Sequence, residues 1–586
     1  MERKDDLNNN HAHGEPDSIS DDDKSISRQS GDTSGYAILD DSTKEEESHG
    51  ASPKQQKYGW RFWAVFFGLA VTALISGMEG VILSTALPTI SRDLGPGENY
   101  SWVVNAYFLT SAAVQPLYGQ LADIFGRRWN MLGAVAIFAL GSGICGGATS
   151  SDMLIAGRAV QGIGAGGLNM LIDVIICDLV PLRERGTYVG LLFMIVTVGS
   201  ACGPVVGGAI VDNTSWRWVF YFNLPFCGLA LLLLWAFLRT AFKNEASLAA
   251  KLKRIDYIGN AIIMGATVAM LFAVTYGGTR YAWSSPHTLT PLILGLLGLI
   301  VLAPLFECSR FATNPVIPPR LFANNRTACL AYFVTFQHAI VTYWVTFFLP
   351  VYFQSVLRAA PTRAGVMMLP TVTLFAPCAA VAGGVVSKTG RYKPLAVAGL
   401  LVVTVSVGCL TLLDAQTHTA VWVVLQGLVA AGLGAVISTL LPAVQAGVPE
   451  TEAAATTATL AFVRSIATVW GIAVPAAIFN NRFDQLLPGI GDAGVRALLA
   501  NGKAYERASR EFINGFQEPL RSQIVGVYAK SLSRSWAIAV VFAGTALVAA
   551  CFEKELKLRT ELENEHGLEK KADSVNAEEN GTVHKG

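Results

Sequence analysis

Long apolar segments without charge are the feature that most restricts how this chain of 586 residues can fold. A bilayer core about 30 Å thick is crossed by about 20 apolar residues in a helix. Backbone groups in lipid must form their hydrogen bonds internally, and these runs are too long for barrel strands, so they are predicted to be transmembrane helices. Asp, Glu, Lys and Arg are absent from residues 130–151, 187–211, 257–279, 281–306, 327–357, 364–387 and 415–449.

The spacing of these segments predicts fourteen spans. The fold class is therefore an all-α integral membrane protein, with two six-helix bundles and two inserted helices. The charged fraction of 15% agrees with this class, since soluble domains contain about 25% charged residues. The predicted spans cover residues 62–88, 101–122, 130–149, 152–179, 187–211, 216–238, 256–278, 288–307, 328–355, 363–386, 394–413, 420–446, 453–480 and 534–552.

An internal duplication supports the prediction of two bundles. Three short matches recur at nearly the same separation and at matching positions within each half. Repeated halves that enclose a central site are a transporter architecture. The repeated segments are 119–127 with 383–391, 161–162 with 426–427, and 87–88 with 349–350.

The spans and the duplication together divide the chain into five parts. The first part is acidic and rich in Ser, and we expect it to be a disordered cytoplasmic tail. The predicted parts are the tail 1–57, a six-helix bundle 58–240, a linker 241–310 with two extra spans, a second bundle 311–553 with an outer loop 481–533, and a tail 554–586.

The distribution of Lys and Arg predicts that both tails lie in the cytoplasm. The short loops on the opposite side hold only Arg92, Arg217, Arg280, Arg358 and Arg363. The first apolar run begins near residue 60, too late for an ordinary cleaved signal peptide. We expect a multi-pass protein of the plasma membrane, with the vacuolar membrane as the alternative, and a monomer.

Glu79 in span 1 and Arg158 in span 4 are ionisable residues within apolar helices. Such residues are costly in a membrane and often mark a proton or substrate path. Both positions fall in the outward half of their spans, where the side chains can meet across the bundle interior. A buried carboxylate beside a cation can change its protonation between conformations, so we predict a proton-coupling pair. A static structural ion pair is the alternative.

The loop between spans 2 and 3 combines small residues with a cluster of charges. The glycines permit close approach of helices and loop, and the charged groups can form pairs at the membrane surface. We predict that this cluster latches the two bundles together in one conformation, although arginines that only set the topology are the alternative. The residues are Gly119, Asp123, Gly126, Arg127 and Arg128.

Span 5 carries a series of small residues on one helical face together with a proline that bends the helix. This pattern predicts a flexible interface between the two bundles. The residues are Gly199, Gly203, Pro204, Gly207 and Gly208.

Polar and aromatic residues of both halves are candidates for a substrate cavity. Arg464 lies mid-span and is expensive there, whereas the simpler interpretation of His338 is a buried imidazole with a hydrogen-bond partner. Asp173 and Asp178 lie in the inner third of span 4. The cavity candidates are Gln161, Asn169, Phe336, Gln337, His338, Tyr343 and Arg464.

Several other functions lack support in the sequence. The segment 162–167 formally fits the dinucleotide pattern G-x-G-x-x-G but lies within a span, without the strand that this pattern requires. No Walker motif is present, and the nine cysteines have no zinc-ligand spacing. The net charge of +1 argues against nucleic acid as a partner. We therefore expect no enzyme activity, no metal and no cofactor.

Together these motifs resemble the major facilitator superfamily over residues 60–555, and in particular its fungal drug:proton antiporters with fourteen spans. The segments Glu79…Ala86-Leu87-Pro88 and 216–225 are also similar to that family. The span 5 motif is the antiporter signature of the family and is associated with export. The family usually has Asp where this chain has Glu79, so the reach of the acid differs.

The resemblance implies a proton-coupled antiporter that exports a small hydrophobic drug, toxin or secondary metabolite, with the proton gradient as its energy source. The expected partners are this substrate, protons and the bilayer. Two alternatives stay open. One is an uptake or vacuolar permease for an iron chelate or an amino acid, and the other is a nutrient sensor that transports nothing.

Overall fold

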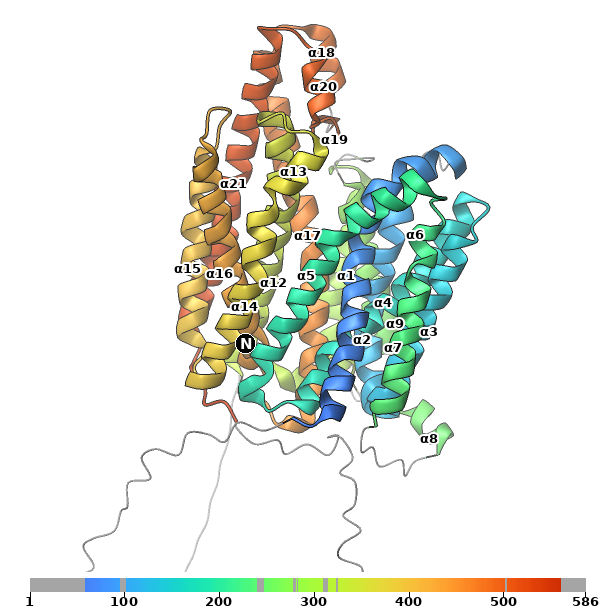
Figure 1. Ribbon diagram of the computed structural model, residues 1–586. Helices are drawn as coiled ribbons and strands as arrows, with labels where there is room; N and C mark the ends of the chain where they lie inside the picture. Colours follow the sequence, from blue (N-terminus) through green and yellow to red (C-terminus); the bar gives the residue numbers. More distant parts are fainter. Residues whose placement is uncertain are drawn as a thin grey trace, which may run out of the picture. The chain divides into compact units, whose positions relative to one another are not determined.

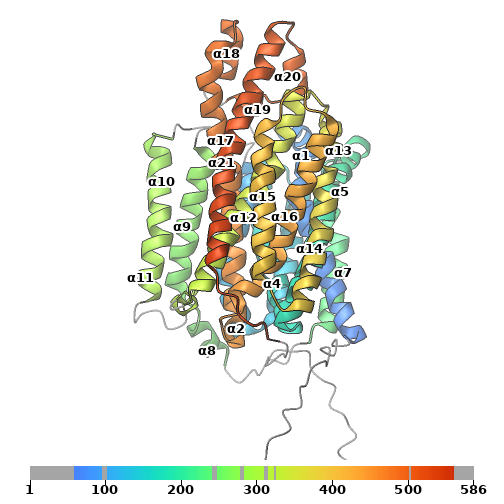
Figure 2. The same ribbon diagram turned by 90° about the vertical axis from the view of Figure 1, so that its left-hand side faces the viewer.

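The computed structural model describes residues 58–94, 102–239, 247–277, 281, 283–308, 315–322, 325–500 and 503–559. The predicted tail 1–57 and most of the tail 554–586 lie outside the described residues. Long helices run side by side through the described chain, as Figures 1 and 2 show.

The helices follow the predicted spans closely, although several are interrupted by short turns. Spans 6, 8, 9, 10 and 11 are each divided between two or three elements. The elements are α1 (Trp60–Leu94), α2 (Trp102–Phe125), α3 (Arg127–Gly146), α4 (Ser151–Leu179), α5 (Leu182–Asn213), α6 (Trp218–Tyr221), α7 (Asn223–Phe237), α8 (Leu248–Lys253), α9 (Tyr257–Tyr276), α10 (Pro286–Leu297), η2 (Gly298–Leu302), α11 (Ala303–Glu307), η3 (Pro319–Leu321), α12 (Arg326–Val351), η4 (Tyr352–Val356), α13 (Pro361–Met367), α14 (Leu369–Thr389), α15 (Lys393–Cys409), η5 (Leu410–Leu412), α16 (Thr419–Gln445), η6 (Glu450–Glu452), α17 (Ala453–Leu486), η7 (Leu487–Gly489), α18 (Ala493–Leu499), α19 (Lys503–Glu506), α20 (Arg510–Asn514) and α21 (Leu520–Phe552).

Twelve helical segments of the described chain are long and apolar enough to cross a membrane. The fourteen predicted spans include two further helices, α2 and α5, which have 24 and 32 residues. Helix α2 is interrupted by the polar residues Asn105, Gln115 and Gln120, whereas α5 has charged residues only near its ends, and its residues 187–211 hold none.

The described helices form two halves and have two ends. The N half is α1–α7 and the C half is α12–α21. The basic end is the end of the helices where Arg127, Arg185 and Lys393 lie, at the bottom of Figure 1. The opposite end carries α18–α20, which are called the outer hairpin together with the adjoining ends of α17 and α21.

Small residues bring the helices of the N half close together. A Cβ atom on Gly162 would lie 2.4 Å from the Tyr107 carbonyl oxygen of α2, and one on Gly164 would lie 2.4 Å from the Phe138 amide nitrogen of α3. Helix α4 is thus packed between two neighbours. In lipid, where the hydrophobic effect does not draw helices together, such close contact is a main source of association.

The C half repeats this arrangement, as the duplication predicts. Gly126 and Gly390, which end the two copies of the motif, both have positive φ angles, of 85° and 70°. Their ψ angles differ, at 162° and 9°, so the two copies share the positive φ that glycine adopts most readily but not the whole backbone conformation. A Cβ on Gly434 would lie 2.2 Å from the Phe375 carbonyl oxygen, which makes the contact between α16 and α14 as close as that between α4 and α2.

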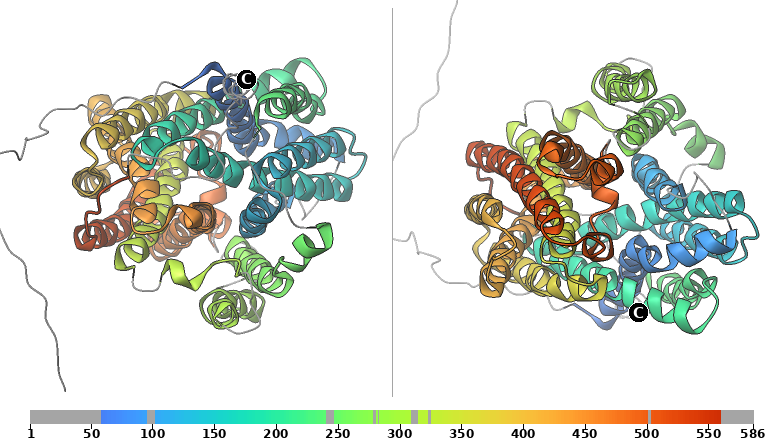
Figure 3. Two further views of the ribbon diagram at one scale, coloured as in Figure 1. Left: turned by 90° about the horizontal axis from the view of Figure 1, so that it is seen from below. Right: turned by 90° about the horizontal axis from the view of Figure 1, so that it is seen from above.

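The inserted helices α9–α11 form a hairpin on the flank of the two halves, which Figure 3 shows from both ends. Asn260 of α9 donates a hydrogen bond of 2.8 Å to Gln120 of α2. Gly295 of α10 approaches the backbone of Ala266 and Met270 of α9 closely. The second inserted span therefore contacts the bundles mainly through the first.

The loop predicted at residues 481–533 is a folded helical hairpin, and the helices of spans 13 and 14 extend into it beyond the predicted span boundaries. Helix α17 continues to Leu486 and α21 already begins at Leu520 (Figure 1). Phe483, Ile513 and Tyr528 are fully buried, and the Tyr528 hydroxyl donates a 2.7 Å hydrogen bond to the Ala504 carbonyl oxygen. These residues belong to one continuous hydrophobic core that the hairpin shares with the long helices of the C half.

After α21, residues 553–559 cross the basic end as an extended strap. The Tyr392 hydroxyl donates to the Lys554 carbonyl at 2.9 Å, and Lys393 donates to the Glu553 carbonyl at 2.7 Å. Further along, the Arg183 amide of the N half donates to the Arg559 carbonyl at 3.3 Å. The strap therefore contacts both halves.

We expect docking of the strap to weaken as the pH rises. Burial raises the pKa of the Glu553 carboxyl from about 4.5 to about 7, although Lys393 opposes the shift. The docked carboxyl holds its proton to a higher pH than the free one, so docking is favoured while the carboxyl is protonated. The equilibrium constant for docking of the strap therefore falls about tenfold between pH 6 and pH 8. Hydrogen exchange of the amides of residues 553–559, corrected for intrinsic rates, measures this loss. The Glu553→Gln variant should show the same protection at both pH values, and an equal loss in this variant would contradict the prediction.

Candidate functional site

The predicted proton-coupling residues are in direct contact within the N half. Arg158 of α4 donates from Nη1 to Oε1 of Glu79 of α1, and Asn223 of α7 donates to the other carboxylate oxygen at 2.6 Å. Glu79 has no exposed surface and Arg158 is 1% exposed. Three helices thus meet at one carboxylate in the interior of the N half.

Other polar groups complete this cluster and hold Arg158 in place. Its Nε donates to the Val103 carbonyl at 3.0 Å, and its Nη1 also donates to Gln161 Oε1 at 2.6 Å. Gln161 in turn donates to the Ser142 hydroxyl at 2.9 Å. The Tyr107 ring lies 4.3 Å from the guanidinium carbon, a cation–π arrangement.

The chemistry of this cluster follows from its burial. Removing two charges from water is expensive, and loss of either partner would leave the other uncompensated. In this conformation each carboxylate oxygen of Glu79 accepts a hydrogen bond, one from Arg158 and the other from Asn223. A rearrangement that withdrew Arg158 or Asn223 would favour protonation of the carboxylate.

The charge cluster of the loop between spans 2 and 3 is internal to the N half. Arg127 pairs with Asp178 of α4 at 2.8 Å and with Asp123 at 3.1 Å, and Arg128 donates to the Trp235 carbonyl at 2.6 Å. These three contacts lie within the N half. Gly119 differs, since a Cβ on it would lie 2.6 Å from that of Ala458 of α17.

The two halves are joined at the basic end by a set of charged contacts from the start of α5. Arg185 donates to Glu450 at 2.6 Å and to Gln445 at 2.8 Å, and it is almost fully buried. Arg183 donates to the carbonyl oxygens of Ser387 and Lys388 at the end of α14. Sequence reasoning counted these arginines only for topology.

Deeper in the molecule, a second ion pair crosses between the halves. Arg464 of α17 donates to Asp173 of α4 at 3.0 Å, and its guanidinium lies 5.0 Å from the Phe193 ring of α5. Next to it, Gln115 of α2 donates to the Ser465 hydroxyl at 2.7 Å. The sequence singled out Asp173 and Arg464 as unusual within spans, but not as partners.

The other candidates for a substrate cavity are divided between several environments. Asn169 accepts a 2.7 Å hydrogen bond from Ser76 in the N half. His338 is buried with a ring nitrogen 2.9 Å from the Leu433 carbonyl oxygen, and Gln337 donates to Thr545 at 2.7 Å. Phe336 and Tyr343 are partly buried. The interpretation of His338 as a buried imidazole with a partner agrees with its contact.

The glycines of span 5 lie against α1 and not against the second bundle. A Cβ on Gly199 would lie 2.4 Å from the Leu74 carbonyl oxygen, and one on Gly203 would lie 3.0 Å from that of Met78. Gly208 has open space beside it. The prediction that Gly199 and Gly203 form an interface between the two bundles is therefore wrong for this conformation. Pro204 and Gly207 lie in the same helix.

Close contact between the halves instead involves Gly186 of α5 and Gly383 of α14. A Cβ on Gly383 would lie 2.5 Å from the Gly186 carbonyl oxygen, whereas one on its neighbour Gly384 would have no heavy atom within 4 Å. We predict that Gly383→Ala destabilises the protein by about 1–3 kcal/mol, because the two helices must move apart. The matched control is Gly384→Ala, which should leave the melting temperature in detergent unchanged. Equal melting temperatures for the two variants would contradict the prediction.

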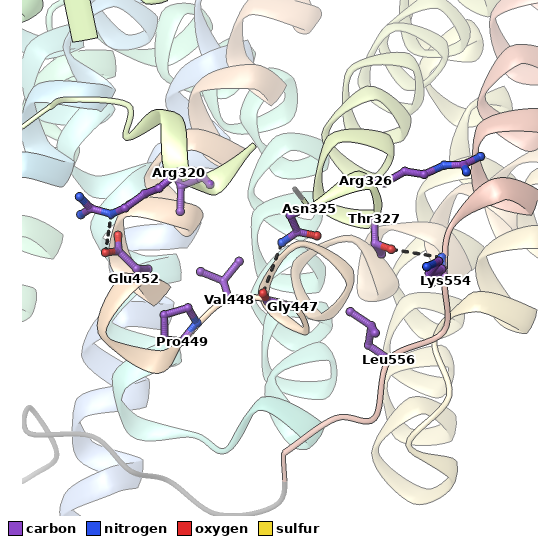
Figure 4. Close-up of a pocket in the computed structure, with 11 residues that line it drawn as sticks. Arg320, Asn325, Arg326, Thr327, Gly447, Val448, Pro449, Glu452, Lys554 and Leu556 are labelled. Carbon is purple, nitrogen blue, oxygen red and sulfur yellow. Dashed lines mark hydrogen bonds and ion pairs between the residues drawn. The ribbon is translucent and has the colours of Figure 1, made fainter. Parts of the chain in front are cut away.

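A cavity of about 480 Å³ lies at the basic end of the C half (Figure 4). Arg320 and Glu452 form an ion pair of 2.7 Å at one side, and the strap residues Lys554 and Leu556 form the other. No residue predicted for the substrate cavity lines it. Its position beside the strap separates it from the Glu79 cluster.

Comparison with known proteins gives the family. The model of the Major Facilitator Superfamily matches residues 69–472. The chain belongs to the Major Facilitator Superfamily. The MFS-type efflux transporter ffsH of Aspergillus flavipes is 51% identical, with 92% of this chain and 93% of the relative covered. The MFS-type efflux transporter phmH of Phaeosphaeria nodorum is 48% identical over 94% of this chain and 95% of its own.

Solved structures agree with this membership at the level of the fold. The human organic anion transporter MFSD10 has a TM-score of 0.53 and 15% identity, with 83% of this chain and all of its own covered. The proton:xylose symporter XylE has a TM-score of 0.52 and 14% identity, with 84% and 96% covered. The prediction of a Major Facilitator Superfamily transporter, and not an enzyme, is confirmed by these matches and by the relatives.

Proposed function

We propose that this protein is a proton-coupled antiporter that exports a small hydrophobic organic molecule, such as a drug, toxin or secondary metabolite. The observation that carries the proposal is the buried Glu79–Arg158 pair, in a chain that is 51% identical to an MFS-type efflux transporter. A carboxylate enclosed by three helices is suited to carry a proton when those helices rearrange.

Export as the direction of transport is supported by the relatives. Both ffsH and phmH are named efflux transporters, and they match this chain along almost its whole length. The span 5 antiporter signature, Gly199 to Gly208, points the same way. The chain would therefore bind its substrate from the cytoplasm and release it outside, in exchange for protons that move inward.

The topology that we propose has fourteen spans, with α2 and α5 as the two beyond the twelve apolar ones. Helix α2 lies between α4 and α17, and α5 lies between α1 and α14, so each has a polar or glycine-rich face against protein. The basic end lies in the cytoplasm, with both tails there, and the outer hairpin lies outside. We place the protein in the plasma membrane as a monomer.

Alternating access is the proposed mechanism, with residues 58–240 and 311–553 as two rocking bundles. The charged contacts between the halves gather at the basic end, as with Arg185 and Glu450. The described conformation is accordingly assigned to an outward-facing state whose cytoplasmic side is closed. The cavity would lie between the bundles, with Asn169, Phe336, Tyr343 and Arg464 among its lining, and the loop cluster Gly119–Arg128 would stiffen the closed state.

The test is substrate accumulation in cells with and without this protein, with and without a protonophore, over a panel of hydrophobic drugs and fungal metabolites. Lower accumulation that the protonophore abolishes is the expected result for at least one compound. Higher accumulation in cells that contain the protein would replace export by uptake. Lower accumulation that persists with the protonophore would contradict the proton coupling.

A further inference from the structure

A second ion pair links the two halves at a depth different from that of Glu79. Arg464 and Asp173 lie on opposite halves, 3.0 Å apart, and both are largely buried. On α4, Asp173 follows Arg158 by 15 residues, which corresponds to about 22 Å along the helix toward the basic end. The pair cannot persist if the halves separate at the basic end.

Among charged groups, the one on which the charge state of Asp173 mainly depends is Arg464, its partner in the ion pair. Arg464 is the only charged residue of α17 between residues 453 and 481. Helix α1 carries no charge at residues 62–78, and α2 carries none at residues 102–122. Besides the two partners themselves, the titratable groups within electrostatic range are Cys177 of α4, which Asp173 reaches, and His338 of α12, which Arg464 reaches. Arg185 of α5 donates to the Cys177 carbonyl, one turn beyond Asp173 on α4.

A polar contact lies between the two carboxylates. Ser76 is one turn from Glu79 on α1, and Asn169 is one turn from Asp173 on α4. The Ser76 hydroxyl donates to Asn169 at 2.7 Å. Polar groups thus extend through the N half from the depth of Glu79 to that of Asp173.

We propose that Asp173 is a second proton-coupling residue, whose ionised form closes the basic end through its ion pair with Arg464 and whose protonated form releases it. The inference rests on the proposed proton antiport and extends it from one carboxylate to two. Glu79 exchanges its proton on the outer side, and Asp173 releases its proton on the side of the basic end.

The step balances as a simple proton transfer. When Asp173 takes up a proton from a hydronium ion that enters from the outer side, an O–H bond of the hydronium ion breaks and one to the carboxyl forms. The carboxyl becomes neutral, water is left behind, and Arg464 keeps its positive charge but loses its partner. The halves can then part, since a neutral carboxyl holds the guanidinium less strongly. Once the basic end is open, the carboxyl releases its proton to the water there, and the ionised group pairs with Arg464 again as the end closes.

The experiment measures opening of the basic end without any substrate. Spin labels at Arg239→Cys of the N half and Thr389→Cys of the C half report the distance between the halves by pulsed electron resonance, after the exposed native cysteines are replaced by Ser. The background is Glu79→Gln, so that the outer carboxyl does not contribute. We expect the ratio of open to closed molecules to rise about tenfold from pH 8 to pH 5.5.

Three variants in this background decide the role of Asp173. Asp173→Asn should reduce the pH response to less than about twofold, and Asp173→Glu should retain it. Arg464→Gln, the second variant should Asp173→Asn fail to fold, should leave the end open at both pH values. The matched control Ser465→Ala removes a neutral contact between the halves, and it should favour opening by the same factor at every pH.

One outcome would overturn the inference. It is a pH response in Asp173→Asn equal to that of its background, with or without a loss of closure by the same factor at each pH, as for Ser465→Ala. Failure of the proposed function is distinguished by the accumulation assay with the wild-type protein. Export that a protonophore abolishes, together with this outcome, would leave the antiporter intact and remove only the role of Asp173.

Discussion

The Glu79→Gln variant is expected to lose proton-driven export while it keeps its fold. The amide can still accept from Arg158 and has nearly the same shape, but it cannot take up and release a proton. Removal of a group that transfers a proton lowers rates by about 100-fold or more in enzymes, and we expect a similar loss here. The measurement is export of an identified substrate from cells, at several external pH values, normalised to the amount of protein in the membrane.

The control for this variant is Asp152→Asn. Asp152 is an exposed carboxyl in the first turn of α4, the same helix that carries Arg158. It should export at the wild-type rate. Export by Glu79→Gln that remained sensitive to the protonophore, with an unchanged pH profile, would show that this carboxyl carries no coupled proton.

Arg158 and the length of the acid give two further expectations at the same site. Arg158→Ala leaves the Glu79 carboxylate buried and without its cation, which should destabilise the fold by about 3–5 kcal/mol.

Glu79→Asp restores the acid that the family usually has, but the shorter side chain cannot reach both Arg158 and Asn223 from the same backbone position. We expect intermediate export from it and a melting temperature below that of Glu79→Gln.

The meeting of Glu79 with Arg158 could be predicted from the sequence because charges within spans are rare and must find partners. Each lies in an apolar helix, and their positions place them at the same depth. The same logic failed for Asp173 and Arg464. These residues belong to different halves, and their pairing depends on how the two halves pack together. A local sequence pattern does not predict that packing.

Arg185 was missed for a different reason. It lies in the first turn of α5, next to a short connection between spans, where an arginine is adequately explained by membrane topology. Its partner Glu450 lies 265 residues away in the short helix η6. The outer hairpin was missed because α18, α19 and α20 are at most seven residues long. Helices this short lack a periodic signal, and they are stabilised by packing of Phe483, Ile513 and Tyr528.

The Arg185→Ala variant is expected to open the basic end more than any other single change of a surface or interface charge. Arg185 donates to Glu450 and Gln445 of the C half and to the carbonyl oxygens of Cys177 and Val180 of its own half. Its removal leaves a largely buried carboxylate and an amide without this donor. Breaking a buried pair in this way costs about 3–5 kcal/mol, which shifts the closed state by a factor of about 100 or more.

The measurement is the rate at which a membrane-impermeant thiol reagent modifies Ser438→Cys in inside-out vesicles, together with the melting temperature. Ser438 of α16 is fully buried beside Gly190 of α5 in the closed state. Arg320→Ala is the matched control, since Arg320 pairs with Glu452, two residues beyond Glu450, but is 63% exposed. An exposed pair contributes only about 0–1 kcal/mol, so this control should change neither quantity by much. Equal modification rates and equal melting temperatures for Arg185→Ala and Arg320→Ala would contradict this prediction. The buried ion pair of Arg185 would then not hold the halves together, and closure of the basic end would depend on the glycine packing of α5 against α14.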